Sequence, residues 1–183
     1  LARLAEFTKL HTLHLDETQI TDAGLIHLKE LTNLKSLQLW GTQVTEAGLE
    51  SLKDFELESL GIPVEATTNL GLKNYLAMIP PAPELHLDQW KITDAGLEHL
   101  KGQTHLQELE LSATKITDAG LIHLKGLADL QILDLRGTKV TDAGLVHLEG
   151  LTNLTNLYMD DTKIRDAGLA HLKGLLNLDY LSL

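Results

Sequence analysis

The amino-acid sequence predicts an α/β solenoid, a right-handed superhelix in which each repeat adds one short strand and one short helix. Threonines recur every 24 residues at Thr114, Thr138 and Thr162. The phrase Thr-Asp-Ala-Gly-Leu follows the first two of them and Leu-x-x-Leu-x-Leu precedes them, with Met159 as its last member before the third. Self-similarity with a period of about 20 to 50 residues is typical of repeat proteins that stack unit on unit. These three observations together predict the architecture.

Each repeat begins with a strand. Leu13 and Leu15 alternate with the polar residue His14, and this period of two places the leucines in the core and the residue between them on the opposite face. The same alternation recurs in the later repeats, so we expect parallel strands that line a curved, concave sheet.

A short helix follows each strand and is expected on the convex side. Leu25, Leu28 and Leu31 are spaced three apart, as on one face of a helix, after Thr21, which is expected to cap it, and Asp22, which suits the N-terminal dipole. Glycines recur where the helix should end, and left-handed glycines are a common way to close a helix. These glycines are Gly102, Gly126, Gly150 and Gly174.

The 24-residue, helix-bearing repeat with Leu-x-x-Leu-x-Leu, for example at Leu106, Leu109 and Leu111, resembles the leucine-rich repeat family over essentially the whole chain. The Thr-Asp-Ala-Gly-Leu phrase is most similar to the cysteine-containing and related bacterial subclasses. Those subclasses carry Cys or Asn where this chain has threonine, as at Thr138. The threonine hydroxyl is expected to hydrogen-bond backbone in the turn and so to preserve the fold.

Residues 1–183 are expected to form a single domain of about seven to eight repeats, taken from a longer chain. One repeat, at about residues 58–84, is degenerate and contains all four prolines. Because proline has no amide donor, the strand ladder is expected to be interrupted near Pro63 and Pro83. This repeat is interpreted as a worn unit, with a hinge or partner notch as the alternative.

The composition excludes several classes of protein. Fifteen Lys plus Arg against 26 Asp plus Glu give a net charge of -11, which argues against binding to nucleic-acid phosphates. No apolar run reaches the roughly 18 residues of a membrane span, so a soluble protein is expected, in a compartment that the sequence does not define. There is no cysteine, no nucleophile with its base and no phosphate-binding glycine loop. We therefore expect no enzyme activity, no catalytic residues and no cofactor.

Two columns of residues follow the same period. We interpret the histidines as packing between successive helices and bonding backbone, because a ladder does not make metal ligands converge, and no metal site is predicted. We interpret the lysines as a solvated ladder neutralised by neighbouring aspartates, with an acidic partner edge as the alternative. The columns comprise His27, His99, His123, His147 and His171, and Lys91, Lys115, Lys139 and Lys163.

The concave face is the predicted binding site, because the repeat does not dictate residue identity there. Acidic residues predominate on it, and exposed aromatic residues in a polar surface are typical of interface hot spots. We expect a protein-binding module that recognises a basic or mixed-charge protein or peptide. The alternative is a structural scaffold that associates end to end and has no dedicated ligand. The predicted partner-binding residues are Trp40, Glu84, Asp88, Glu108, Glu110, Asp134, Arg136, Tyr158, Asp160 and Tyr180.

Overall fold

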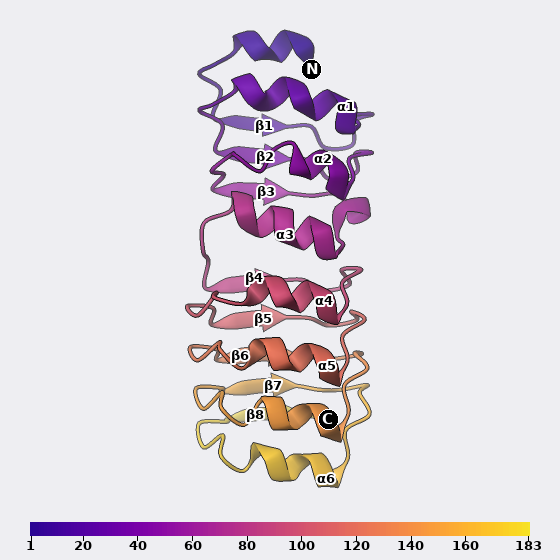
Figure 1. The fold of residues 1–183 in the computed structure, drawn as a ribbon, viewed down its shortest axis with the longest axis vertical. Helices are drawn as coiled ribbons and strands as arrows, with labels where there is room; N and C mark the ends of the chain where they lie inside the picture. Colours follow the sequence, from indigo (N-terminus) through magenta and orange to yellow (C-terminus); the bar gives the residue numbers. More distant parts are fainter. The chain divides into compact units, whose positions relative to one another are not determined.

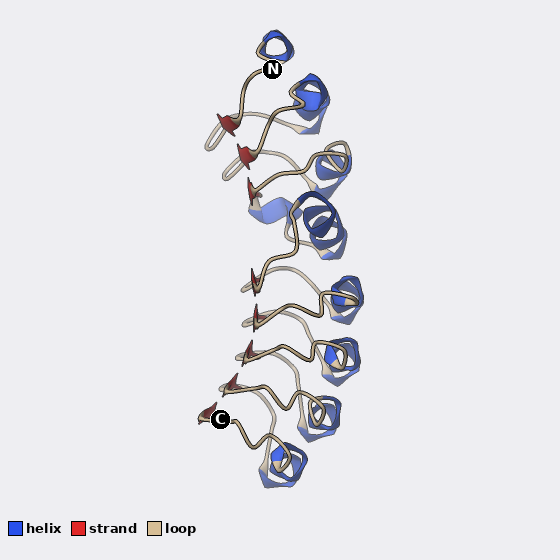
Figure 2. Cartoon of the chain, turned by 90° about the vertical axis from the view of Figure 1, so that its left-hand side faces the viewer, coloured by secondary structure: helices blue, strands red, loops and turns tan.

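The computed structural model describes residues 1–183, which form two compact units, Leu1–Pro80 and Pro81–Leu183. Both units are built from the repeat that the sequence predicts, a strand, a turn and a short helix (Figure 1). In each unit the strands lie along one side and the helices along the other (Figure 2). The α/β class is therefore confirmed, whereas the single domain stays a prediction.

The first unit contains a parallel three-stranded sheet in the order β1-β2-β3. The central leucines Leu13, Leu37 and Leu60 are register partners. Its elements are the 3₁₀ helix η1 (Ala2–Glu6), β1 (Thr12–His14), α1 (Asp22–Leu25), η2 (Ile26–Glu30), β2 (Ser36–Gln38), α2 (Glu46–Glu50), β3 (Ser59–Gly61), η3 (Val64–Ala66) and α3 (Asn69–Met78).

The second unit contains a parallel five-stranded sheet in the order β4-β5-β6-β7-β8. Leu85, Leu109, Leu133, Leu157 and Leu181 are its central register partners. Its elements are β4 (Glu84–His86), α4 (Asp94–Leu97), η4 (Glu98–Leu100), β5 (Glu108–Glu110), α5 (Asp118–Leu121), η5 (Ile122–Leu124), β6 (Ile132–Asp134), η6 (Asp142–His147), β7 (Asn156–Tyr158), α6 (Asp166–Leu169), η7 (Ala170–Leu172) and β8 (Tyr180–Ser182).

The core of each unit lies between its sheet and its helices. The strand leucines Leu109, Leu133 and Leu157 are fully buried, as are helix leucines such as Leu121 and Leu145. This burial removes apolar side chains from water at roughly 25 cal/mol per Å² and is the main term that holds the repeats together. The residues on either side of each strand leucine point away from the core.

The threonine prediction is confirmed. Each threonine hydroxyl donates a hydrogen bond to the carbonyl three residues earlier, at 2.5 to 2.7 Å. The residue just before each of these five threonines has a positive φ, as has Gln89 before Trp90 at the equivalent position, and this bends the chain from strand to helix. These threonines are Thr18, Thr42, Thr114, Thr138 and Thr162.

The aspartate of the Thr-Asp-Ala-Gly-Leu phrase ties each repeat to the next. Asp118 accepts hydrogen bonds from the backbone N–H and the hydroxyl of Thr141, both at 2.7 Å. A Cβ on Gly144 would collide with that carboxylate, so the glycine is required by close approach. Asp22 and Asp94 make the same pair of bonds to Thr45 and Thr117.

The helices differ from the prediction at both ends. Thr45, Thr117 and Thr141 accept capping bonds from the backbone, but Thr21 accepts none. At the other end Gly102 has a positive φ and is left-handed as predicted. The prediction is wrong for three other glycines, because a 3₁₀ turn closes those helices without a left-handed residue. They are Gly126, Gly150 and Gly174.

The proline-containing repeat departs most from its neighbours. Strand pairing stops at β3 and starts again at β4, in the region where the prolines predict an interrupted ladder. Between these strands lies α3, the longest helix, whose N-cap Thr68 accepts a bond from Gly71. Whether this segment is a worn repeat or a hinge stays a prediction. None of the helices has the length and apolar character that a membrane crossing requires.

Candidate binding face

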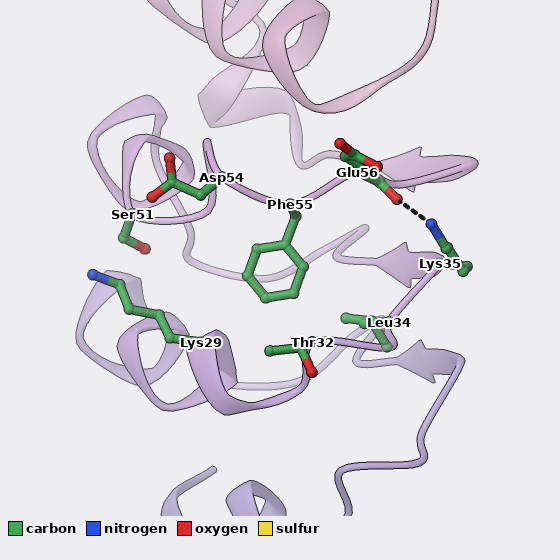
Figure 3. A pocket seen from close by; sticks show the side chains of 8 residues that line it. All are labelled: Lys29, Thr32, Leu34, Lys35, Ser51, Asp54, Phe55 and Glu56. Atoms are coloured by element: carbon green, nitrogen blue, oxygen red, sulfur yellow. Dashed lines mark hydrogen bonds between the residues drawn. The ribbon is translucent and has the colours of Figure 1, made fainter.

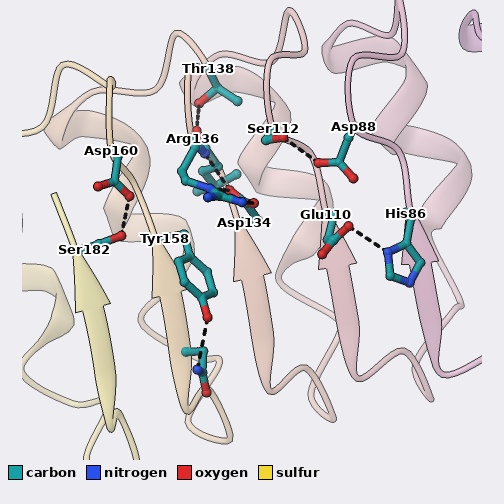
Figure 4. Close-up of polar contacts among 12 residues, drawn as sticks. His86, Asp88, Glu110, Ser112, Asp134, Arg136, Thr138, Tyr158, Asp160 and Ser182 are labelled. Atoms are coloured by element: carbon teal, nitrogen blue, oxygen red, sulfur yellow. Dashed lines mark hydrogen bonds and ion pairs between the residues drawn. The ribbon is translucent and has the colours of Figure 1, made fainter.

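The side chains that point away from the core in the second unit form one surface, which we call the strand face. It comprises the first and third residues of β4 to β8 and the residues two positions beyond each strand, such as Asp88 and Arg136. A continuous row of polar and aromatic groups runs across the strands on this face (Figure 4). The strands space these groups by about 4.8 Å, so counterparts in successive repeats lie within reach of one another, as His86 and Glu110 do.

A cluster of titratable groups lies on β4 and β5. His86 and Glu110 are register partners, and His86 Nδ1 lies 2.7 Å from Glu110 Oε2. Asp88 follows His86 by two residues and accepts a 2.5 Å hydrogen bond from the hydroxyl of Ser112. Glu84 Oε2 lies 3.7 Å from the other ring nitrogen of His86. We call His86, Asp88 and Glu110 the His-acid cluster.

The charges of the cluster act on one another. The contact with Glu110 raises the pKa of His86. Burial raises the pKa of Asp88, but hydrogen bonds from Ser112 and Glu110 outweigh it and leave the value below its ordinary range. The hydrogen bond with Asp88 raises the pKa of Glu110. Two carboxyl groups therefore face each other with only one imidazole to balance them.

Arg136 lies at the middle of the strand face. Its guanidinium Nε lies 2.9 Å from Asp134 Oδ2, and the same carboxylate accepts a bond from the backbone N–H of Arg136. This pairing raises the pKa of Arg136. Asp134 is only 2% exposed, so it holds Arg136 in place and offers little surface of its own. The guanidinium also lies over the ring of Tyr158, 5.3 Å from its centroid, in a cation–π contact.

The far end of the strand face is aromatic. The rings of Tyr158 and Tyr180 are 5.0 Å apart and inclined by 38°. Tyr180 is 49% exposed, so its ring presents a large apolar area to solvent. Asp160, beside them, accepts a hydrogen bond from Ser182. The strand face thus changes from acidic at β4 and β5 to aromatic at β7 and β8.

Trp40 lies in the first unit. Its indole N–H donates to Gln38 at 3.1 Å, and its backbone N–H donates to Asp16 at 3.0 Å. A side chain at Gly61 would collide with both Trp40 and Gln38, so the glycine leaves room for the ring. Trp40 is 55% exposed and offers a second aromatic contact point.

The structure thus places the sequence-predicted site residues in distinct groups. Asp88 and Glu110 meet in the His-acid cluster, with Glu84 and Glu108 beside them on the first positions of β4 and β5. A second group lies beside Asp160 and comprises Asp134, Arg136, Tyr158 and Tyr180. Trp40 belongs to the other unit. Sequence reasoning did not select His86. The signal for it was present, because His86 and Glu110 are separated by one repeat.

The two periodic columns differ from their interpretation. His171 bonds the carboxylate of Glu149 at 2.7 Å instead of backbone, and the Nδ1 atom of His147 is buried without a partner. The aspartates expected to neutralise the lysines accept hydrogen bonds from the next repeat instead, Asp94 and Asp118 from threonines and Asp142 from the backbone N–H of Arg165. The lysines are exposed, as expected of a solvated ladder.

A cavity of about 330 Å³ lies in the first unit (Figure 3). The chain is one residue shorter here than in the neighbouring repeat, between Leu52 and Leu57, and Phe55 lines the cavity. The Nζ atom of Lys35 donates to the Glu56 carbonyl at 3.2 Å across one side. None of the charged side chains that line it is buried, so the cavity lacks the buried polar group of a built ligand site.

Comparison with known proteins agrees with this architecture. One leucine-rich repeat family model matches residues 104–164 and a second matches residues 8–29. Comparison with curated proteins gives no match.

Two solved structures from Listeria monocytogenes are similar to this chain. An internalin (InlF) has a TM-score of 0.62 at 24% identity, covering 100% of this chain and 50% of its own, so this chain spans half its length. Internalin C2 has a TM-score of 0.59 at 27% identity, covering 98% of this chain and 76% of its own.

The repeats, the parallel sheets and these matches define a solenoid repeat protein. Residues 8–29 and 104–164 match leucine-rich repeat models, so the chain carries leucine-rich repeats. Proteins of this fold generally serve as protein-interaction modules and are typically not enzymes.

Proposed function

We propose that this chain binds a basic or mixed-charge protein or peptide on the strand face of its second unit. The observation that carries the proposal is the aromatic pair of half-buried Tyr158 and exposed Tyr180, braced by Arg136, beside half-exposed carboxylates on one sheet. Binding would occur by surface complementarity without a chemical step, so no catalytic residue and no cofactor is needed.

The tyrosine pair supplies the apolar contact area. Tyrosine is enriched at interface hot spots because a rigid ring buries a large area at little cost in conformational entropy. Tyr158 is held between Arg136 and Tyr180, so its ring is already positioned. Tyr180 is exposed on its outer side and is the group that a partner would cover.

The carboxylates define the charge of the partner. Glu84, Glu108 and Glu110 lie on neighbouring strands, and His86 balances only part of their charge. Lysine or arginine side chains of a partner would be attracted to this end, whereas nucleic-acid phosphates would be repelled. Trp40 supplies a separate aromatic contact in the first unit.

Capture from a cell lysate with three baits tests the proposal. The first is the wild-type chain, and the second carries Tyr158→Ala and Tyr180→Ala. The third carries Ile122→Ala and Val146→Ala, which remove exposed apolar side chains from the helix side. A protein retained by the first and third baits but lost from the second supports the strand face. Equal retention by all three, or loss from the third bait alone, contradicts it.

Sedimentation of the purified chain tests the scaffold alternative. A chain that grows into end-to-end assemblies with concentration, and whose three baits capture nothing, would support a self-assembling scaffold. A monomer over the same concentration range would exclude it.

A further inference from the structure

We propose that His86, Asp88 and Glu110 form a binding site for one divalent transition-metal ion, of which Zn²⁺ is the best fit. The nitrogen and carboxylate oxygens that these three residues offer all lie within 4.8 Å of one another. Zinc bonds to imidazole and carboxylate measure about 2.0 to 2.2 Å, which places tetrahedral ligands about 3.4 Å apart. Small side-chain rotations would therefore bring the three groups to one ion.

The sheet register is what brings the ligands together. His86 on β4 faces Glu110 on β5, and Asp88 projects on the same side two residues after His86. The helix-side histidines do not meet in this way, because each repeat contributes only one of them. One imidazole and two carboxylates form a donor set that suits zinc, and waters would complete the coordination.

In known metal sites a ligand imidazole donates its second N–H to a carboxylate, and Glu84 is the carboxylate on that side of His86, although it lies beyond hydrogen-bond distance in this structure. His86 Nδ1 faces Glu110, and its Nε2 faces Glu84 at 3.7 Å. Asp88 is held by the hydroxyl of Ser112 at 2.5 Å. A divalent ion would replace the imidazole as the balancing charge between the two carboxylates.

The chain contains natural controls for this site. His14, the last residue of β1, and Asp16 occupy the repeat positions of His86 and Asp88, 3.5 Å apart, but Gln38 stands where Glu110 stands in β5. His171 and Glu149 form an imidazole–carboxylate pair at the same 2.7 Å distance as His86 and Glu110, with no third ligand beside them. Neither place offers three ligands, so neither is expected to hold an ion tightly.

Calorimetric titration of the full chain with ZnCl₂ in metal-free buffer tests the proposal. We expect one ion per chain at the tightest site, and at least a tenfold loss of affinity for that ion in His86→Ala and in the shape-conserving Glu110→Gln. The control His171→Ala should keep the wild-type affinity. Titration with Co²⁺ should give visible ligand-field bands that disappear in Glu110→Gln. Circular dichroism checks that each variant remains folded.

Several results would overturn the assignment. Wild-type chain that binds no Zn²⁺, or that binds it equally after Glu110→Gln, excludes the site. A greater loss of Zn²⁺ affinity in His171→Ala than in His86→Ala would assign binding to the helix-side histidine instead. Mg²⁺ binding as tight as Zn²⁺ would show that the imidazole is not a ligand, because Mg²⁺ prefers oxygen.

Discussion

Asp118 and Gly144 explain why the Thr-Asp-Ala-Gly-Leu phrase is repeated. The aspartate bonds the next repeat at Thr141, and the glycine gives that carboxylate room. The sequence predicted a helix start at this phrase, but not the bridge between repeats. The bridge joins residues of successive repeats, about 23 positions apart, as Asp118 and Thr141 are. A capping pattern within one helix therefore could not reveal it.

The first prediction concerns this close approach. Gly144→Ala should lower the free energy of unfolding by about 2 kcal/mol, because the added methyl displaces Asp118 from its two bonds. Gly150→Ala is the control, since a Cβ there meets nothing within 4 Å, and it should change stability by less than about 0.5 kcal/mol. Urea denaturation measures both. Equal losses in the two variants would refute the role of Asp118.

The candidate site was predicted in part, again for reasons that lie at single residues. Alternation within the strands correctly assigned Tyr158 and Tyr180 to the face opposite the core. It gave no measure of burial, so Asp134 was selected although its carboxylate is covered by Arg136. His86 was passed over although it lies one repeat from Glu110, because the period pairs the two positions without showing that their side chains are in contact.

At the scale of elements, the turn after each strand sets the geometry of the repeat. The residue before each turn threonine, or before Trp90 in the same position, is left-handed; these residues are Glu17, Gly41, Gln89, Ala113, Gly137 and Asp161. Only two of these are glycine, so the other positions carry some backbone strain. The 24-residue period predicted where the turns lie. It did not predict the left-handed conformation before the threonine, because the residue type at that position varies.

The second prediction concerns a substitution that removes this backbone strain. Ala113→Gly should raise the free energy of unfolding by about 0.5 kcal/mol, because removal of a left-handed Cβ outweighs the extra flexibility of the unfolded chain. The reverse change, Gly137→Ala, should lower it by about 1 kcal/mol, since an added Cβ meets no atom closer than 3.7 Å and only the φ angle opposes it. Thermal melts compare the pair. The same sign of change in both would contradict the argument.

The helices show how tertiary context limited the prediction of element type. The leucine spacing of three predicted a helix, and a single α turn such as Asp118–Leu121 does form. It then continues as 3₁₀ helix over Ile122–Leu124, in which a spacing of three is natural. The spacing therefore fitted the 3₁₀ helix as well as the α-helix, and the sequence did not distinguish them.

At the scale of the whole molecule, charge is the property on which the proposed recognition depends. The net charge of -11 is spread over a chain with 26 acidic residues, and Glu84 and Glu108 add to it on the strand face. The electrostatic field of these negative charges attracts a basic partner over a distance and is screened by salt. The sequence predicted this property fully, because it depends on composition more than on contacts.

The third prediction follows for a partner captured with the wild-type bait. Its association rate should fall at least tenfold between 50 and 300 mM salt, on the order expected for electrostatic steering. Glu84→Gln with Glu108→Gln should flatten this dependence, whereas Glu30→Gln, on the helix side, should change it little. Stopped-flow or biosensor kinetics give the rates. A rate independent of salt would rule out attraction by the acidic end.

The central claim, that the strand face is the binding surface, is tested most directly by site-specific photocrosslinking. Benzoylphenylalanine is placed at Tyr180 on the strand face or at Ile122 on the helix side, both about half exposed. With the captured partner present, illumination should yield a covalent complex from position 180 and none from position 122. A complex from position 122 with none from position 180 would contradict the account and place recognition on the helices.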